Sequence, residues 1–438
     1  MKYSFTVLAL CLMSVASADE SWPAFQNGGS IVRERQEAFE LGDIQWEAEL
    51  QGYGQSSPIV WEDRIYLTTV EGDSKDQYHV TAYQLSDGAE LWQQTVANAS
   101  PRENNSYVSR AAPSPVADAE GVICLFEGGN IIALAHDGAV RWERNLVESY
   151  GGVEARHGLS ASLEQDTDSV FVWMERAEEP YVVCLSKASG DEEWKSAGPG
   201  ATSWSSPRLV SVEGGQHLVL SASGMIVGVD PETGERLWSF DEISGNTTPT
   251  PMPLGGGRFL IGASAGRGSS GGTRAPESNG VVQISRGDDG TWSAAFAWHA
   301  ERATSSFGSP IVYDDMAFFV NRAGVLYGLK ADTGEEIFAK RLKGSIWATP
   351  ITVGQQVFFF GRDGKVSILD RNAETPNIST WDGLPEPPKT AEPEGDTGRR
   401  GPPGASGPVL YAAAWCENVL VLRRGDRLFA VNVESRRD

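Results

Sequence analysis

Hydrophobic and polar residues follow one another in short runs along this chain, and turn-forming residues separate the runs. The stretch 206–238, SPRLVSVEGGQHLVLSASGMIVGVDPETGERLW, shows the pattern clearly. Apolar strands are expected before Gly214, at 217–222 and at 225–229, each bounded by Gly, Pro, Asp or Ser. Gly234 can take the positive φ that closes a bulged hairpin before Trp238. Because one four-stranded meander cannot bury both of its faces, the pattern predicts neighbours of the same kind.

Two signals recur along the chain. One is glycine followed four residues later by an aromatic residue, at Gly42/Trp46, Gly88/Trp92, Gly138/Trp142, Gly190/Trp194, Gly234/Trp238 and, as a variant, Gly334/Phe338. The other is a small residue and then proline before an apolar run, with the small residue at Ser57, Ser114, Ser206, Thr250, Ser309, Thr349 and Gly407, and Ser162-Leu163 in the one gap. Marks that recur every 40–60 residues or so, with four strands each, predict the blades of a β-propeller.

The marks define eight units, at 53–94, 112–144, 159–195, 206–238, 248–298, 306–340, 347–381 and 407–434. The eighth unit has room for three strands, at 409–413, 418–422 and 427–433, and lacks its outer strand. Residues 42–46 carry the missing Gly-x-x-x-Trp pattern. We therefore expect an all-β, eight-bladed propeller of four-stranded antiparallel blades, with an N-terminal strand completing the last blade and closing the ring.

The first residues have the pattern of a secretory signal peptide. Lys2 precedes the apolar run 5–15, and Ala16-Ser17-Ala18 forms a small-x-small cleavage site. We expect cleavage near Ala18, export to the periplasm or the cell exterior, and one propeller domain over 19–438, with flexible loop insertions at 264–280 and 382–405. Leu10 is too large for the usual lipidation site, so Cys11 is assigned to the discarded run. No later run reaches the roughly 18 apolar residues of a membrane span.

Composition and residue spacing argue against several classes of function. The formal charge of −23 disfavours nucleic-acid binding, which needs basic surface. Cys124, Cys184 and Cys416 are far apart and show no CxxC spacing, which excludes a disulfide framework, a zinc knuckle and c-type haem attachment and predicts buried thiols. The histidines show no HxH or HExxH spacing, and no GxSxG or P-loop occurs, so neither a metal site nor a catalytic residue is assigned.

The repeated Ser-Pro, the paired strands, the Asp-x-x-Thr-Gly turn and the outer-strand Trp, together with Ser21-Trp22-Pro23-x-Phe25, resemble the PQQ-like β-propeller repeat family over about residues 21–438. That family includes quinoprotein alcohol dehydrogenases and the propeller subunit of the bacterial outer-membrane protein assembly machine. The resemblance implies the fold. It leaves the function open, because this scaffold hosts both enzymes and binding proteins.

Two sets of residues stand out in the repeats. The expected structural anchors between blades are Trp46, Trp92, Trp142, Trp194, Trp238 and Phe338. A second set precedes the inner strands and would rim the central channel as a funnel: Tyr53, Arg110, Arg156, His157, Trp204, Thr247, Phe307 and Trp347. The funnel could be ring packing with a solvated mouth, or a pocket for a peptide or small molecule.

We therefore expect a monomeric, non-catalytic scaffold that binds a protein or peptide and carries no cofactor. One alternative is a PQQ-dependent oxidoreductase with Ca²⁺. The resemblance implies an adjacent Cys-Cys pair, carboxylate and amide ligands for calcium, and an Asp base for such an enzyme. This chain has no adjacent cysteines, and no motif assigns Glu154 or Asn246 as ligands, although Trp204 could form a stacking floor. A carbohydrate- or polymer-binding protein that uses the same funnel is the other alternative.

Overall fold

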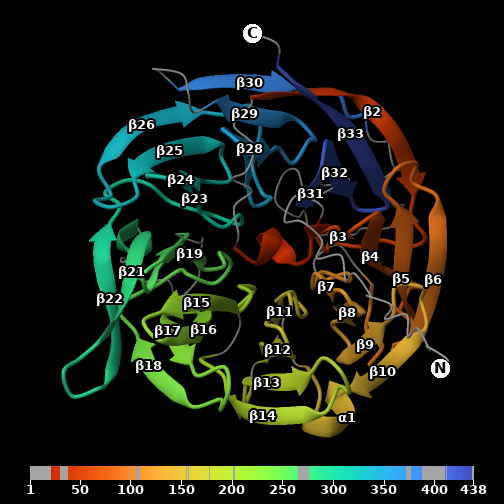
Figure 1. Ribbon diagram of the computed structural model, residues 1–438, viewed down its shortest axis with the longest axis horizontal. Coiled ribbons are helices and arrows are strands. Elements are labelled where there is room, and N and C mark those ends of the chain that lie inside the picture. The colour runs from red at the N-terminus through yellow and green to blue at the C-terminus, as the bar shows by residue number, and fades with distance from the viewer. Residues whose placement is uncertain are drawn as a thin grey trace, which may run out of the picture.

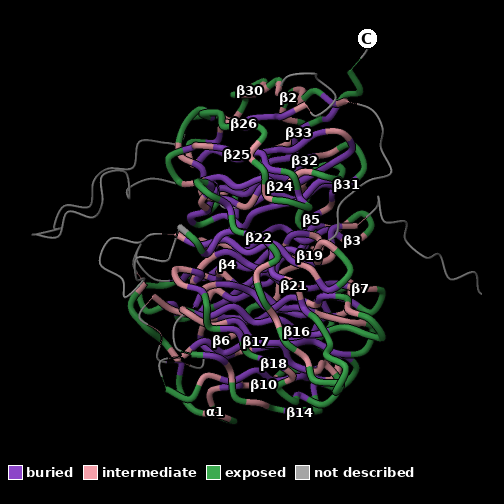
Figure 2. The backbone as a smooth tube through the Cα atoms, turned by 90° about the vertical axis from the view of Figure 1, so that its left-hand side faces the viewer, coloured by how far each residue is buried: buried purple, intermediate pink, exposed green. Residues whose placement is uncertain are grey.

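The structure is a computed structural model, which describes residues 21–29, 38–98, 100–104, 109–153, 155, 157–176, 178–200, 203–264, 276–370, 376–386, 410 and 412–436. In this part of the chain, eight sheets stand around a central axis in chain order (Figure 1). Neighbouring strands in every sheet are antiparallel, as the pairs β12/β13 and β28/β29 illustrate. The predicted all-β, eight-bladed propeller is confirmed. Figure 2 shows buried backbone running through the body of the molecule, with exposed segments at its surface.

Each blade is built from strands that follow one another from the inner to the outer edge. Blade 1 holds β3 (Ile59–Trp61), β4 (Arg64–Glu71), β5 (Gln77–Gln84) and β6 (Glu90–Ala97), and blade 2 holds β7 (Val116–Asp118), β8 (Gly121–Leu125), β9 (Asn130–Leu134) and β10 (Val140–Asn145). Blade 3 holds β11 (Glu164–Gln165), β12 (Ser169–Met174), β13 (Tyr181–Ser186) and β14 (Glu192–Ala197), and blade 4 holds β15 (Arg208–Val212), β16 (Gly215–Ala222), β17 (Met225–Val229) and β18 (Arg236–Phe240).

The second half of the ring has the same plan. Blade 5 holds β19 (Met252–Gly255), β20 (Arg258–Ile261), β21 (Gly280–Arg286) and β22 (Trp292–His299), and blade 6 holds β23 (Ile311–Tyr313), β24 (Met316–Val320), β25 (Val325–Lys330) and β26 (Glu336–Arg341). Blade 7 holds β27 (Ile351–Val353), β28 (Gln356–Phe360), β29 (Val366–Asp370) and β30 (Asn377–Trp381), and blade 8 holds β31 (Ala412–Cys416), β32 (Val419–Arg424), β33 (Arg427–Ser435) and β2 (Phe39–Glu49). The helical segments are η1 (Phe25–Gly29), α1 (Leu146–Tyr150) and η2 (Pro276–Ser278).

The ring closes through β2, which pairs antiparallel with β33 as its outer neighbour. This confirms that the N-terminal strand completes the last blade, and the strand is longer than the predicted 42–46. The inner strand of blade 8 was predicted wrongly at 409–413 and is β31, Ala412–Cys416. The reason is the tight turn to β32, in which Glu417 has a φ of 50° and Cys416 pairs with Val419. This turn sets the pairing of the two strands, so β31 lies further along the chain than the predicted range.

The N-terminus adds a strand that the repeats did not predict. β1 (Ser21–Trp22) pairs antiparallel with β3 and makes blade 1 five-stranded. The predicted signal peptide at 1–18 and Cys11 lie outside the described residues, as do most of the insertions at 264–280 and 382–405. The boundaries of the single domain and the monomeric state stay predictions.

The structure explains the Gly-x-x-x-Trp signal as a contact between neighbouring blades. The Trp46 indole donates to the carbonyl of Leu85 at 2.9 Å, and a Cβ at Gly88 would lie 2.5 Å from the Trp46 ring. The same indole-to-carbonyl bond joins Trp92 to His136, Trp142 to Lys187, Trp194 to Pro231, Trp298 to Ala331 and Trp381 to Gly42. The glycine therefore makes room for the tryptophan of the preceding blade.

Two of the expected anchors depart from this rule. Trp238 donates to Nδ1 of His217 at 3.0 Å within its own blade. Phe338 packs on Gly328, also in its own blade, where a Cβ would lie 2.4 Å from the ring. Trp298 and Trp381 make the inter-blade bond without the glycine four residues earlier, which is why the sequence pattern missed them.

Small residues at the starts of the inner strands form a second belt around the axis. In six of them the hydroxyl accepts the backbone N–H of the equivalent residue in the preceding blade. Ser114 accepts from Ser57 at 2.9 Å, and the series continues at 2.9–3.1 Å through Ser162, Ser206, Thr250, Ser309 and Thr349. Where the ring closes, buried Arg423 bonds instead to the carbonyls of Ser56 and Thr68, at 3.0 and 2.7 Å. This belt brings the inner strands into one layer and fixes the geometry of the funnel.

Candidate functional site

The predicted funnel residues lie on one face of the ring, which we call the entry face. Because strands alternate in direction within a blade, the connection into the inner strand and the turn between the second and third strands reach the same face. The connection from β20 to β21 and that from β30 to β31 contain the two predicted insertions, so both connections start and end on the entry face. The described ends of both non-repeated connections therefore lie on this face.

The structure gathers the funnel residues into separate groups. The Arg110 guanidinium lies 3.6 Å from the ring centroid of Tyr53. The ring centroids of His157 and Trp204 are 5.6 Å apart, and the backbone N–H of Trp204 donates to the Thr247 carbonyl at 2.6 Å. Phe307 and Trp347 form a third group with ring centroids 4.7 Å apart. Arg156 lies outside the described residues.

The centre of the ring is occupied by η1, the red coil in the middle of Figure 1. Gln26, Asn27 and Gly28 have φ of 55°, 53° and 60°, a left-handed turn that costs free energy for residues with a Cβ. Arg208, fully buried at the start of β15, holds this turn by donating to Gln26 Oε1 at 2.9 Å and to the Phe25 carbonyl at 3.2 Å. Its other terminal nitrogen lies 3.1 Å from the carboxylate of Glu164.

A cavity of about 150 Å³ opens between η1 and the third funnel group. Phe307, Trp347, Phe25 and Gln26 line it, and its remaining lining residues are Ser57, Ala348, Thr349, Ile351, Ala412 and Ala413. Phe307 is 40 % exposed, and it is the only aromatic residue among the exposed large hydrophobic residues of the described chain. We call this cavity the rim pocket.

Hydrogen bonds from two blades hold Trp347 in place. Its indole donates to Ser345 Oγ at 2.8 Å, and the Ser345 hydroxyl donates to the carbonyl of Arg322 in blade 6. The carbonyl of Ser345 accepts the N–H of Arg362 at 2.7 Å, and the Arg362 guanidinium lies 4.9 Å from the Trp347 ring centroid. The aromatic wall of the rim pocket is therefore fixed before any ligand arrives.

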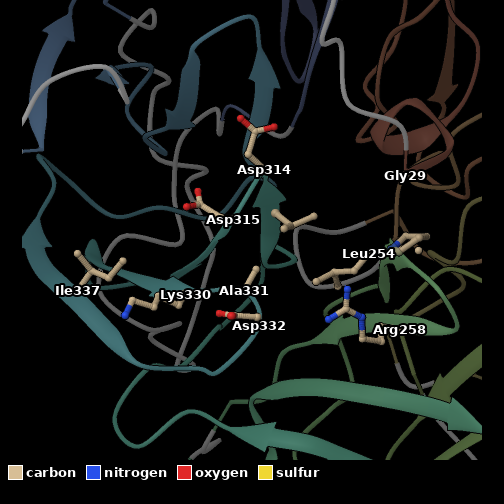
Figure 3. Close-up of a pocket in the computed structure, with 12 residues that line it drawn as sticks. Gly29, Leu254, Arg258, Asp314, Asp315, Lys330, Ala331, Asp332 and Ile337 are labelled. Atoms are coloured by element: carbon tan, nitrogen blue, oxygen red, sulfur yellow. The ribbon is translucent and has the colours of Figure 1, made fainter.

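A larger hollow of about 840 Å³ lies between blades 5 and 6 on the opposite face (Figure 3). Its lining mixes the carboxylates of Asp314, Asp315 and Asp332 with the cations of Arg258 and Lys330. Across the described residues, no three His, Cys, Asp or Glu side chains come together as ligands for a metal ion. The mixed charges of this hollow do not define one class of ligand.

Three buried carboxyl groups lie near the entry face or the axis. Burial raises the pKa of Glu127 and Glu164, although Lys75 and Arg208 respectively oppose the shift. Glu175 has no such cation, and burial raises its pKa well above the usual range. Its Oε1 accepts the N–H groups of Ser160 and Ala161 at 2.9 and 3.2 Å. These groups tie the connections into the inner strands to neighbouring parts of the ring, which is a structural role.

The described residues offer no group of ligands for the calcium ion of a PQQ site. Cys124, Cys184 and Cys416 are free and buried in the strands of three different blades, as predicted for structural thiols. The Asn246 amide is fully buried, donates to Ser221 Oγ at 2.9 Å and accepts from Gly224 at 2.9 Å, so it is not available as a ligand. Glu154 lies outside the described residues.

The sequence did not single out four residues that shape the rim pocket: Phe25, Gln26, Arg208 and Arg362. Phe25 belongs to the noted Ser-Trp-Pro-x-Phe stretch, but only its place on the axis gives it a role. Arg322 and Arg362 occupy equivalent positions, in the Asn-Arg-Ala-Gly and Gly-Arg-Asp-Gly turns after β24 and β28. Comparing these two turns could have revealed a paired cation on neighbouring blades.

Solved structures share this fold. BamB from Moraxella catarrhalis is similar over 91% of this chain and 99% of its own, with 15% identity and a TM-score of 0.58. A europium-containing methanol dehydrogenase is similar over 94% and 98%, with 10% identity and a TM-score of 0.59. The quinohemoprotein alcohol dehydrogenase from Comamonas testosteroni is similar over 97% and 82%, with 10% identity and a TM-score of 0.58. At such identities the likeness shows the fold alone.

No curated protein matches the sequence. Within the described residues, no helix has the length and apolar character needed to cross a membrane. The family model described as outer membrane protein assembly factor BamB matches residues 21–172, 153–274 and 277–435. Because these matches span most of the chain, the protein belongs to the PQQ-like β-propeller family that this model describes.

Proposed function

We propose that this protein is an exported, non-catalytic scaffold that binds segments of other proteins at the entry face. The observation that carries the proposal is the rim pocket, an aromatic concavity with a prearranged wall on the face that holds the non-repeated connections. Its 150 Å³ is smaller than the roughly 300–1,000 Å³ of sites for small molecules and cofactors, and it suits one side chain of a larger partner. Export to the periplasm or cell exterior is part of this proposal.

Photo-crosslinking in the source cell tests the proposal. A benzophenone amino acid at Phe307 is expected to give a discrete protein adduct. The matched control places it at Val140, which is 51 % exposed on β10 and lies away from the entry face. Adducts at both positions, or at neither, would contradict a binding site at the rim. The double substitution of Trp204 and Trp347 by Ala is expected to weaken the adduct in the folded protein.

The dehydrogenases among the structural neighbours favour a second candidate, an oxidoreductase that uses PQQ. Titration of the purified protein with PQQ and Ca²⁺, followed by absorbance and melting temperature, separates the two candidates. We expect no saturable change in either. Stoichiometric binding at micromolar concentration would overturn the scaffold proposal. Carbohydrate binding is tested in the same melting assay with oligosaccharides. It would raise the melting temperature of the wild type and leave that of the Trp347→Ala variant unchanged.

A further inference from the structure

Residues 21–29 lie inside the ring and are not needed to close it. In the described part of the chain, all eight blades have four strands when β1 is left out, and the ring closes through β2. We infer that the surface that contacts residues 21–29, which we call the axial site, is a second peptide-binding site that this chain fills with its own segment. The ligand class is an extended segment with the pattern Trp-Pro-Ala-x-Gln-x-x-Gly. This site lies on the axis and adds to the rim pocket of the proposed function.

The ring offers backbone groups to an extended segment at the axis. β1 pairs antiparallel with β3, with Ser21 opposite Trp61 and Trp22 opposite Val60. β3 is the innermost of the four repeated strands of blade 1, so its axial edge is free to pair when β1 is absent. In blade 2, the N–H of Ala117 donates to the carbonyl of Pro23 at 2.8 Å. Addition of a strand to a free sheet edge is a recurring mode of peptide binding.

Two buried side chains of the segment give the axial site its apolar specificity. Trp22 is 2 % exposed and belongs to an apolar core shared by blades 1, 7 and 8. Ala24 is 3 % exposed and belongs to the core of blades 2 and 3. Protein cores are closely packed, so a larger or charged residue at position 24 would force its neighbours apart. The axial site therefore selects a large aromatic residue followed two positions later by a small one.

Arg208 of blade 4 supplies a polar contact that the ring itself holds in place. One terminal nitrogen of its buried guanidinium lies 3.1 Å from the carboxylate of Glu164 in blade 3. The other donates to Gln26 Oε1 at 2.9 Å, and hydrogen bonds to a charged group are stronger than those between neutral groups. Further along, Gly29 has a φ of 81°, and a Cβ there would lie 2.9 Å from Pro253 Cδ. Glutamine at 26 and glycine at 29 are therefore the other determinants of the ligand.

The docked segment also carries costs that are relieved when it leaves. Gln26 and Asn27 have φ of 55° and 53°, which is unfavourable for residues with a Cβ. The indole nitrogen of Trp22 and Nε of Arg208 are buried with no hydrogen-bond partner among the described residues, and water would supply one after release. Because ring closure depends on the pairing of β2 with β33, the segment can leave while the eight blades stay assembled.

A peptide supplied in trans tests the axial site in the full-length protein. The double substitution Trp22→Ala and Ala24→Asp weakens the chain's own segment and changes no residue of the blades. The probe is the capped peptide Ser-Trp-Pro-Ala-Phe-Gln-Asn-Gly-Gly, added in a calorimetric titration. We expect one peptide to bind per chain, about tenfold or more tightly than to the wild type. In the wild type the tethered segment competes at an effective concentration on the order of millimolar.

Changes in the peptide assign its affinity for the double variant to particular contacts. A peptide with Gln26→Leu is expected to bind roughly tenfold more weakly, the effect of one hydrogen bond to a charged group. A peptide with Gly29→Ala should also bind more weakly, because its methyl group would lie against Pro253. Ser21→Ala keeps the backbone of β1 and should bind like the native peptide. The negative control carries Trp22→Ala and Ala24→Asp and should not bind.

Melting curves show whether the double variant folds, and the milder Gly29→Ala protein takes its place if it does not. Failure of both proteins to fold would mean that the ring requires the segment, which overturns the inference. So would the absence of peptide binding to a folded variant, equal affinity for the variant and the wild type, or equal affinity for the native and negative-control peptides. The crosslink at Phe307 in the wild type tests the proposed function separately, because the axial site there keeps its own segment.

Discussion

The indole nitrogen of Trp381 donates a 3.0 Å hydrogen bond to the carbonyl of Gly42, 339 residues earlier in the chain. This bond joins the outer strand of blade 7 to the strand that closes the ring. Trp46, four residues after Gly42, makes the same bond to Leu85 in blade 1. The closing strand is therefore held from both sides by contacts identical to those between other blades.

Substituting Trp381 by Phe should remove this bond and keep most of the ring. We expect the free energy of unfolding to fall by about 1 kcal/mol, the usual value of one hydrogen bond. Urea denaturation followed by circular dichroism measures the change. Trp61→Phe is the control, because the structure shows no hydrogen bond from the Trp61 indole to a described residue. An equal loss in both variants would mean that the bond to Gly42 contributes nothing.

The hydroxyl belt predicts the effect of changes at Ser206. Its Oγ accepts the buried N–H of Ser162 at 2.9 Å. Ser206→Ala leaves that donor without an acceptor and should destabilise the protein by about 1–3 kcal/mol. Ser206→Thr should stay close to the native stability, because threonine already fills the belt at 250 and 349. If the Thr variant is as unstable as the Ala variant in urea, the belt is not the cause.

His217 predicts a loss of stability in acid. It is 3 % exposed, its Nδ1 accepts the Trp238 indole N–H, and burial lowers its pKa below 6.5. A lowered pKa means that the unfolded chain takes up the proton first as the pH falls. The contribution of His217 is therefore full above pH 6.5 and is lost progressively below that value.

This prediction is checked by comparing the urea midpoint of the wild type and His217→Gln between about pH 8 and pH 5, a range that spans the ordinary histidine pKa. The glutamine cannot titrate, so the variant should lose less stability over this range. The difference should be on the order of 1 kcal/mol, which is the value of the hydrogen bond to Trp238. Parallel pH profiles for the two proteins would show that His217 does not titrate in the folded state as described.

Glu175 predicts the opposite dependence on pH. Its raised pKa means that the folded protein holds a proton that the unfolded chain releases above about pH 4.5. Its contribution is therefore greatest at low pH and is lost as the pH rises through the folded pKa. Glu175→Gln, which keeps an oxygen for Ser160 and Ala161, should remove this loss and be more stable than the wild type at about pH 8, by about 1 kcal/mol or more.

The stabilities of the wild type and the Glu175→Gln variant are compared in urea over the same pH range as for His217. The control is Glu90→Gln, since Glu90 is exposed at the start of β6. A wild type and a Glu175→Gln variant with the same stability at the alkaline end of the series would show that the buried carboxyl is not a source of instability. The two variants should change the pH dependence of stability in opposite directions. A general effect of pH on the fold would instead change both in the same direction.

Much of the architecture could be predicted because its signals are local. The turn at Gly234 has the positive φ expected of it, 73°, and the bulge lies between Gly228 and Val229 as the hairpin required. The inner strand of blade 8 could not be placed, because its register depends on the turn at Glu417 and not on the preceding Gly-Pro mark. The funnel residues were found by position, but their grouping into Tyr53 with Arg110, or Phe307 with Trp347, depends on packing across blades.

The sequence by itself determined the blade, the number of blades and the strand that closes the ring. These follow from short-range patterns of apolar runs and turn residues, repeated often enough to be recognised. Only the tertiary structure decided which carbonyl each Trp meets, that η1 occupies the axis and that Gln26 lines the rim pocket. The reason is physical: such contacts join residues up to hundreds of positions apart, and the geometry of the closed ring, which no local pattern contains, brings them together.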